Sequence, residues 1–170
     1  TDLAGIRGIA KLMSPKGLEE AVKLAITESF DKSCLIEEFV EGDEYSVEYV
    51  SYKGKHNFLA LTKKYTTGAP HFVETGHVEP ALVDESMLVA IKQVVEHALD
   101  SLGIEYGASH SEIKITQEGN IRIIEIGGRM GGDIIGSNLV EMSTGIDFVK
   151  AVIDISVGEK PDLEPKHQGN

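Results

Sequence analysis

The chain has little cysteine, no long apolar run and few positive charges. Cys34 is the only cysteine among the 170 residues, so no internal disulfide can form, which suits a reducing, cytoplasmic environment. No apolar run approaches the roughly 20 residues of a membrane-spanning helix, and we expect no signal peptide. The 16 basic residues stand against 28 acidic ones, and this net charge of −12 disfavours a nucleic-acid partner. These scarcities predict a cytoplasmic protein without membrane or nucleic-acid partners.

The length and pattern predict a mixed chain of helices and strands. At 170 residues it can bury a core as one domain or two small lobes. The clearest helix covers 84–102, where apolar residues share one face, Asp84 can cap the start and Gly103 ends it. An earlier helix is predicted to open at Ser14, as N-cap, with Pro15 in its first turn. Alternating or apolar runs predict strands over 34–40, 45–50 and 56–65.

The most informative stretch runs from Ser111 to Asp133 and reads SEIKITQEGNIRIIEIGGRMGGD. Two β-rich runs flank a turn at 117–120, which predicts a hairpin. A two- or four-residue loop would place Glu112 opposite Glu125. A three-residue loop with Gly119 in the left-handed conformation would shift the register by one and put these carboxylates on opposite faces. We favour the first register.

Two glutamates that face each other require a compensating interaction, because like charges across a sheet are destabilising. A divalent cation such as Mg²⁺ held between Glu112 and Glu125 supplies this interaction. The alternative is a solvated sheet face on which both side chains point to water. A glycine-rich run follows at once. Arg129 within it offers a planar fork for phosphate or carboxylate oxygens, and Asp133 is expected to cap the next helix. Together these features predict a site for a metal ion and an anion.

The order S-E-I-K, a turn, then I-E-I-G-G-R-M-G-G-D resembles the metal-binding end of the ATP-grasp fold. Within that superfamily it is most similar to carboxylate–amine ligases that include the L-amino acid (dipeptide-forming) ligases. The resemblance implies an α+β fold of two lobes, each with an antiparallel sheet and helices, and a nucleotide cleft between them. It would divide the chain into part of an N-terminal lobe (1–41), a catalytic lobe (42–158) and a polar tail (159–170), without the family's N-terminal domain.

The resemblance also assigns nucleotide contacts. The turn Gly5-Ile6-Arg7-Gly8 is similar to part of a loop that closes over phosphates, although it also fits an ordinary hairpin. An acidic run follows the predicted strand at 34–40, and its pattern resembles the family's hinge between lobes. Adenine would be contacted by Glu37 and the backbone of Glu38 and Val40, ribose by Glu44, and a phosphate by Lys64. An acidic surface loop and a solvated lysine are the alternatives for Glu44 and Lys64.

The run E-T-G-H points to a substrate site. In the similar ligases the glutamate meets a substrate amino group and the histidine lies by the reacting carboxyl, which implies these roles for Glu74 and His77. A packed strand histidine is the alternative for His77. Zinc is rejected, because Gly76 argues against a helix and no second histidine stands at the required spacing. His110 is expected beside the metal site in a supporting or structural role.

The implied activity is ATP-dependent amide or peptide bond formation. With Mg²⁺ (or Mn²⁺) held by Glu112 and Glu125, the γ-phosphoryl group of ATP would pass to a carboxylate, and an amine would attack the acyl phosphate. Arg129 would balance the developing charge. The partners would be a small-molecule carboxylate and amine, with amino acids as the expected substrates, and the full-length protein could form a homodimer.

One departure from the family keeps other functions open. The family usually has E-x-N-x-R, and Gly127 stands here where the asparagine would be. This places a second metal ion in doubt, and we expect the isolated piece to ligate poorly or not at all. The alternatives are another ATP-grasp enzyme, of the phosphoribosylglycinamide synthetase, biotin carboxylase or carbamoyl phosphate synthase type, and a catalytically silent nucleotide-binding module.

Overall fold

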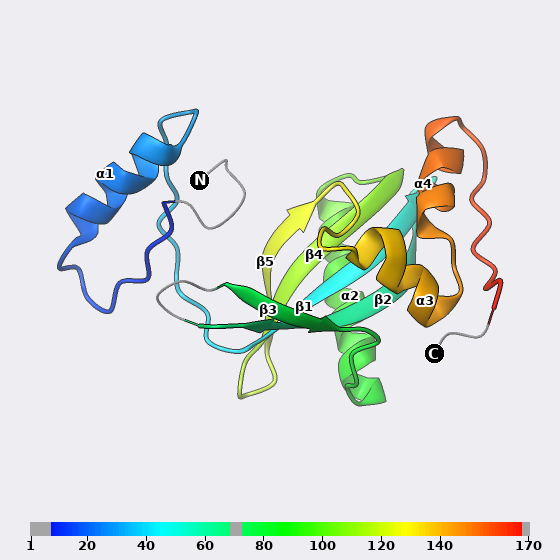
Figure 1. Cartoon of the computed structure of the whole chain (residues 1–170), viewed down its shortest axis with the longest axis horizontal. Helices are drawn as coiled ribbons and strands as arrows, with labels where there is room; N and C mark the ends of the chain where they lie inside the picture. Colours follow the sequence, from blue (N-terminus) through cyan, green and yellow to red (C-terminus); the bar gives the residue numbers. More distant parts are fainter. Residues whose placement is uncertain (1–7, 69–72, 168–170) are drawn as a thin grey trace. The chain divides into compact units, whose positions relative to one another are not determined.

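The computed structural model describes residues 8–68 and 73–167 and joins helices to one five-stranded sheet (Figure 1). The sheet order is β3-β2-β1-β4-β5, and the β1–β2, β1–β4 and β4–β5 pairings are antiparallel, which confirms the α+β prediction. The elements are α1 (Leu18–Glu28), β1 (Asp43–Tyr52), β2 (Lys55–Thr66), β3 (Glu74–Val78), α2 (Glu85–Ser101), β4 (Gly107–Ile115), β5 (Ile121–Gly127), the π-helical turn η1 (Ile135–Leu139), α3 (Val140–Thr144) and α4 (Phe148–Ser156). Among the helices of these described ranges, none has the length and apolar character to cross a bilayer.

The chain divides into two compact units, which we describe separately. The first comprises Thr1–Val40 and Tyr65–Gly76, and the second comprises Glu41–Lys64 and His77–Asn170. In the first unit, α1 begins at Leu18, later than the predicted start at Ser14. Gly17 is the N-cap, with a φ of 87° that glycine adopts without steric cost. The preceding residues form a turn, because Leu18 N donates to Pro15 O at 3.2 Å.

The strand predicted over 34–40 is absent from the sheet. The segment has no strand assignment, and Leu35 and Ile36 are 78% and 69% exposed. Apolar composition favours a strand only where a neighbouring strand offers hydrogen bonds and a packed surface. This segment lies outside the five-stranded sheet, so its composition misled the prediction.

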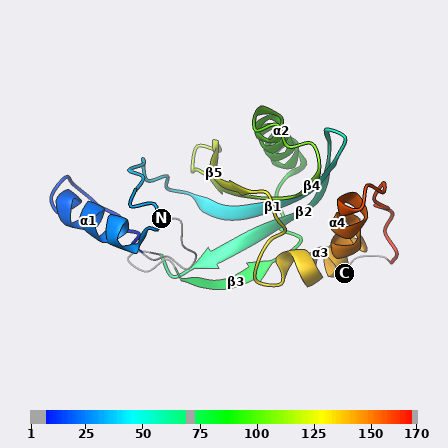
Figure 2. The same cartoon turned by 90° about the horizontal axis from the view of Figure 1, so that it is seen from above.

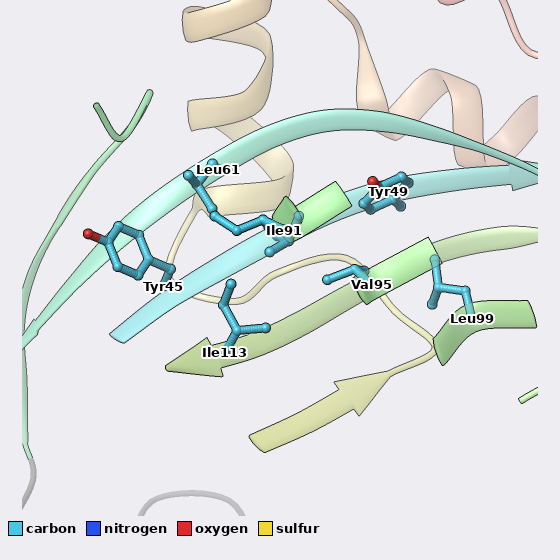
Figure 3. Close-up of a cluster of buried hydrophobic side chains, with 8 residues drawn as sticks. Tyr45, Tyr49, Leu61, Ile91, Val95, Leu99 and Ile113 are labelled. Atoms are coloured by element: carbon cyan, nitrogen blue, oxygen red, sulfur yellow. The ribbon is translucent and has the colours of Figure 1, made fainter. Parts of the chain in front are cut away.

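In the second unit, one face of the sheet packs against α2. Odd-numbered residues of β1 point to this face, where they meet an apolar stripe of the helix (Figure 3). The buried cluster contains Tyr45, Val47, Tyr49, Leu61, Ile91, Val95, Leu99 and Ile113. Helix α2 begins as predicted, with the Asp84 side chain accepting a hydrogen bond from Met87 N. This core holds β1, β2 and β4 together with α2.

The opposite face is apolar only at one end. There, a second buried cluster joins the sheet to α3 and α4, and Figure 2 shows α2 on one side of the strands and α3 on the other. The sheet contributes Val50, Leu59, Ala60 and Ala108 to this cluster. Consecutive residues Leu59 and Ala60 both belong to it because a register shift between β1 and β2 makes Leu59 an extra residue. The remainder of this face is polar and forms the candidate site.

The β4–β5 hairpin places Glu112 and Glu125 as direct cross-strand partners, as we predicted. The route to this pairing differs from the prediction. Next to the turn, Ile115 pairs with Ile121 and Gly119 is left-handed (φ 81°), which is the shifted register that we had set aside. A bulge then makes Ile124 an extra residue and restores the pairing that faces the two carboxylates.

The predicted cap at Asp133 is wrong. Asp133 and Ile134 both have positive φ values, of 47° and 62°, and Ile134 is the N-cap of η1 without a side-chain hydrogen bond. The glycine-rich loop therefore leads into a strained corner and a π-helical turn. Helix α3 follows η1 without a side-chain cap, and the later helix α4 is capped by Asp147, whose side chain accepts a hydrogen bond from Lys150 N.

The segment 159–167, which we expected to be a polar tail, lies against α3 and α4. Leu163 packs on the second cluster, and Lys166 N donates to Gly145 O at 2.7 Å. This contact lies at the C-cap of α3, where Gly145 is left-handed. The segment thus helps to hold the helices that cover the apolar end of the sheet.

Candidate functional site

The polar part of the second sheet face carries ionisable groups from four adjacent strands. We call it the polar face, and it comprises Glu44, Ser46, Glu48, Thr62, Lys64, His110, Glu112, Lys114 and Glu125. The cross-strand pairs Glu44↔Lys114, Glu48↔His110 and Glu112↔Glu125 place these side chains on one side. Several of the groups are buried, so their charges must be satisfied locally.

Glu112 stands at the centre of the polar face. Its Oε1 accepts a hydrogen bond from Lys64 Nζ at 2.7 Å and lies 3.5 Å from His110 Nε2. His110, followed by Lys64, lowers the pKa of Glu112 from 4.5 to about 2, against the opposing effect of burial. Glu112 is therefore an ionised carboxylate at neutral pH. In the described part of the chain both of these contacts fall on Oε1, which leaves Oε2 available to a ligand.

His110 is a buried cation between two carboxylates. Nδ1 contacts Glu48 Oε1 in a very short hydrogen bond, and Nε2 faces Glu112. Burial lowers the pKa of His110, but its hydrogen bonds with Glu112 and Glu48 and their charges outweigh that effect and raise the pKa from 6.5 to about 9. At neutral pH the imidazolium therefore neutralises part of the buried negative charge.

Glu44 and Lys64, both predicted nucleotide contacts, lie on the polar face. Glu44 Oε1 forms an ion pair of 3.0 Å with Lys114 Nζ, while Lys64 pairs with Glu112. The Lys64 side chain is only 6% exposed, so the alternative of a solvated lysine is excluded. Glu44 is a member of β1 rather than of a surface loop.

The glycine-rich loop brings Arg129 to the same side of the sheet. Gly127 pairs with His110, so a side chain at 127 would point to the polar face. A Cβ built there would lie 3.3 Å from Arg129 Cγ and 3.4 Å from its Nε, which shows that the arginine folds back beside Gly127. The exposed guanidinium is held locally, because Nη1 donates to Met130 O at 3.0 Å.

The donor set fits a divalent cation. The polar face has four carboxylates, from Glu44, Glu48, Glu112 and Glu125, and three cations, from Lys64, His110 and Lys114. Within the described residues, no ion pair or hydrogen bond engages the exposed Glu125 side chain, which stands opposite the ionised Glu112. Two facing carboxylates are ligands that Mg²⁺ accepts, and Gly127 offers no third side-chain oxygen.

The remaining predicted residues are not members of the polar face, or they fall outside the described residues. Arg7 is outside the described residues, whereas Gly8 is within them and has a φ of 67°. The expected adenine contacts at 37, 38 and 40 belong to the first unit, where Glu37 and Glu38 are exposed. Glu74 begins β3, and His77 lies three residues later in the same strand, which confirms that this run is a strand.

Sequence reasoning missed two ionisable members of the polar face, Glu48 and Lys114. Both occupy positions that alternate with apolar core residues, Glu48 between Val47 and Tyr49, and Lys114 between Ile113 and Ile115. The alternation alone places them on the face away from α2. Their burial could not be read from it, because that depends on which strands and loop cover them.

Comparison with known proteins agrees with this geometry. The sequence model of the ATP-grasp domain matches residues 8–137. Alanine–anticapsin ligase of Bacillus subtilis is 26% identical over 148 residues, covering 79% of this chain and 31% of that enzyme. Human carnosine synthase 1 is 29% identical over 138 residues, covering 80% of this chain and 16% of that enzyme.

A solved structure is similar over a larger share of the chain. The L-amino acid ligase from Bacillus licheniformis superposes with a TM-score of 0.78 at 30% sequence identity, covering 92% of this chain and 40% of that protein. The chain thus spans well under two thirds of each of these relatives. Because the family model covers most of the sequence and the polar face carries the motif residues, the chain belongs to the ATP-grasp family.

Proposed function

We propose that the protein is an ATP-dependent carboxylate–amine ligase and that this chain supplies most of its ATP-grasp domain. The observation that carries the proposal is the direct pairing of Glu112 with Glu125 on the polar face. The relatives named above as ligases support the reaction class. The expected substrates are a small carboxylic acid and an amine, with amino acids as the leading candidates.

The polar face supplies the phosphate end of the site. Glu112 and Glu125 would hold Mg²⁺, for which Mn²⁺ could substitute, and the bound cation would neutralise phosphate oxygens. Lys64, which donates to Glu112, would contact a phosphate held there. Arg129, on the same side of β5, would balance charge on the transferred phosphoryl group and on the acyl oxygen. Positioning is the main contribution of these groups to catalysis.

The other assigned residues complete the proposal. Glu44 would take the ribose hydroxyls, and Glu37 with the backbone of Glu38 and Val40 would contact adenine. Arg7 and Gly8 would lie in the loop over the phosphates. Glu74 and His77 would place the amino-acid substrate, whose carboxylate becomes an acyl phosphate before the amine attacks. These roles follow the family resemblance residue by residue.

Nucleotide binding by the full protein tests the metal pair. We expect Glu125→Gln to weaken MgADP binding by about tenfold or more in calorimetric titration, because it removes a charged ligand. Glu118→Gln is the matched control, since it makes the same change on the same hairpin at an exposed position bonded only locally to Thr116. Equal affinities for the two variants and the wild type would contradict the proposed site.

A second candidate, a nucleotide-binding module without ligase activity, is favoured by Gly127. This glycine replaces a potential oxygen ligand two residues from Glu125, on the same face. Phosphate release from ATP in the presence of single and paired amino acids separates the two functions. Release that depends on a particular acid and amine supports the ligase, whereas MgADP binding without any such release supports the silent module.

A further inference from the structure

Glu48 joins two parts of the candidate site through one buried carboxylate. The residue is fully buried in β1. Its Oε1 contacts His110 Nδ1 on β4, while its Oε2 accepts a hydrogen bond from Gly131 N at 3.0 Å. A buried carboxylate is costly unless it is paired and hydrogen-bonded, and these two contacts satisfy both oxygens.

The hydrogen bond from Gly131 N to Glu48 Oε2 fixes the path of the glycine-rich loop. Gly131 has no room for a side chain, because a Cβ there would lie 2.6 Å from Glu48 Oε1, 3.0 Å from His110 Nδ1 and 3.1 Å from Ile135 Cβ. The backbone thus approaches the carboxylate as closely as glycine permits. Since Gly131 follows Arg129 by two residues, this anchor constrains the segment that carries the guanidinium.

The contact between Glu48 Oε1 and His110 Nδ1 fixes the orientation of His110. With Nδ1 bonded to Glu48, the imidazole turns Nε2 toward Glu112 Oε1 at 3.5 Å. The outer partner of a histidine commonly sets its ring orientation in this way. Glu48 therefore acts on Glu112 through His110 and on Arg129 through Gly131.

We propose that Glu48 is a positioning residue that sets the relative placement of Glu112 and Arg129 through a single carboxylate. The inference rests on the proposed function, in which both of those residues serve the phosphate site. Glu48 itself is fully buried and makes no contact with nucleotide or substrate in this role. Its effect on catalysis is indirect.

Amide hydrogen exchange without ligand tests the loop contact in the full protein. Glu48→Gln keeps the size of the side chain but cannot accept hydrogen bonds at both positions, so we expect the Gly131 amide to exchange about tenfold faster or more. The control is Glu96→Gln, because Glu96 accepts from Tyr49 OH at 3.1 Å from α2, on the opposite face of the sheet. This control should leave the Gly131 amide unchanged.

The pattern of exchange distinguishes positioning from general stability. A positioning role predicts faster exchange in the loop while amides of α2 keep their wild-type rates, whereas a merely structural role would raise both together. The wild-type protein provides a test that does not depend on whether a variant folds: the Gly131 amide should be better protected from hydrogen exchange than the amides of Gly128 and Gly132. Equal protection of the three glycines, or a parallel rise in α2 and the loop in Glu48→Gln, would overturn the inference.

MgADP titration then connects the loop to the site. We expect Glu48→Gln to weaken binding about tenfold relative to Glu96→Gln. If both variants bound MgADP with the wild-type affinity, the positioning role of Glu48 would be refuted, and the ligase proposal would remain intact. Absence of MgADP binding to the wild type would instead count against the proposed function, and the exchange experiment would still decide the loop contact.

Discussion

Glu79 is a partly buried carboxylate whose surroundings favour its neutral form. Its Oε2 accepts from Thr62 Oγ1 at 2.5 Å and its Oε1 accepts from Ser143 Oγ at 2.7 Å. Burial raises the pKa of Glu79 above 4.5, and the charge of Glu48 adds to this, while the two hydroxyl donors act in the opposite direction. Glu79 therefore joins β2 to α3 at some electrostatic cost when it is ionised.

This cost predicts a pH-dependent effect of Glu79→Gln. Because the folded pKa is raised, the stabilising contribution of Glu79 is fully present below its unfolded pKa and is lost as pH rises through the folded value. The free energy of unfolding of Glu79→Gln, relative to wild type, should therefore increase as the pH rises above about 4.5. Urea unfolding followed by circular dichroism measures this difference.

Glu118→Gln provides a control of opposite sign. The hydrogen bond from Thr116 lowers the pKa of the exposed Glu118. Its contribution to stability is therefore present at high pH and lost as pH falls. A stability difference for Glu79→Gln that stays flat, or falls with pH as for Glu118→Gln, would show that burial does not dominate at Glu79.

Ser51, His56 and Asp100 illustrate why a site must be judged on access as well as on residue types. Ser51 Oγ lies 2.7 Å from His56 Nδ1, and His56 Nε2 lies 3.1 Å from Asp100 Oδ1, which is the connectivity of a hydrolase triad. The Ser51 side chain is fully buried, so no substrate can reach its hydroxyl. These contacts instead link β1, β2 and the end of α2.

Within helix α2, residues of the same type differ in burial and therefore in their contribution to stability. Leu99 is fully buried in the core beneath the sheet, whereas Leu102, at the C-cap of the same helix, is 61% exposed. We expect Leu99→Ala to lower the free energy of unfolding by about 2–5 kcal/mol through lost burial and a cavity. Leu102→Ala should cost under about 0.5 kcal/mol. Denaturant unfolding measures both, and similar losses would contradict the packing described.

The elements that could be predicted from sequence are those with local signals. Helix α2 was predicted correctly because Asp84, the apolar stripe and Gly103 all act within the helix itself. The segment 34–40 was predicted wrongly because strand formation depends on neighbours that its composition does not encode. Asp133 failed as a cap because it adopts a positive φ at the end of the loop.

The hairpin was predicted in part. The predicted pairing of Glu112 with Glu125 is correct, but it depends on the bulge at Ile124, which no local sequence pattern indicates. The burial of Glu48 was also missed, because it results from the glycine-rich loop, whose Gly131 contacts Glu48 from 83 residues later in the sequence. Polar residues of the site can thus be predicted from a motif, whereas the buried residues that hold them in place can be identified only from the tertiary structure.

The whole molecule carries a large excess of negative charge. A net charge of −12 makes the folded state repel itself, although the polar face is nearly balanced internally. Raising NaCl from about 0.05 M to about 0.5 M at neutral pH should screen this repulsion and raise the melting temperature by about 2–4 °C. Near pH 4.9, the isoelectric point, the same salt change should have little effect. A melting temperature that falls with salt at neutral pH would mean that attractive ion pairs dominate.

The alternation along β1 has a consequence for how this protein can change over time. Tyr45, Val47 and Tyr49 face the core under α2, and the alternating residues Glu44 and Glu48 face the opposite side. Core residues and polar-face residues therefore alternate along one strand. Substitutions at Tyr45, Val47 and Tyr49 can therefore alter thermal tolerance through the core without changing the polar face, whereas a change at the buried and paired Glu48 affects both.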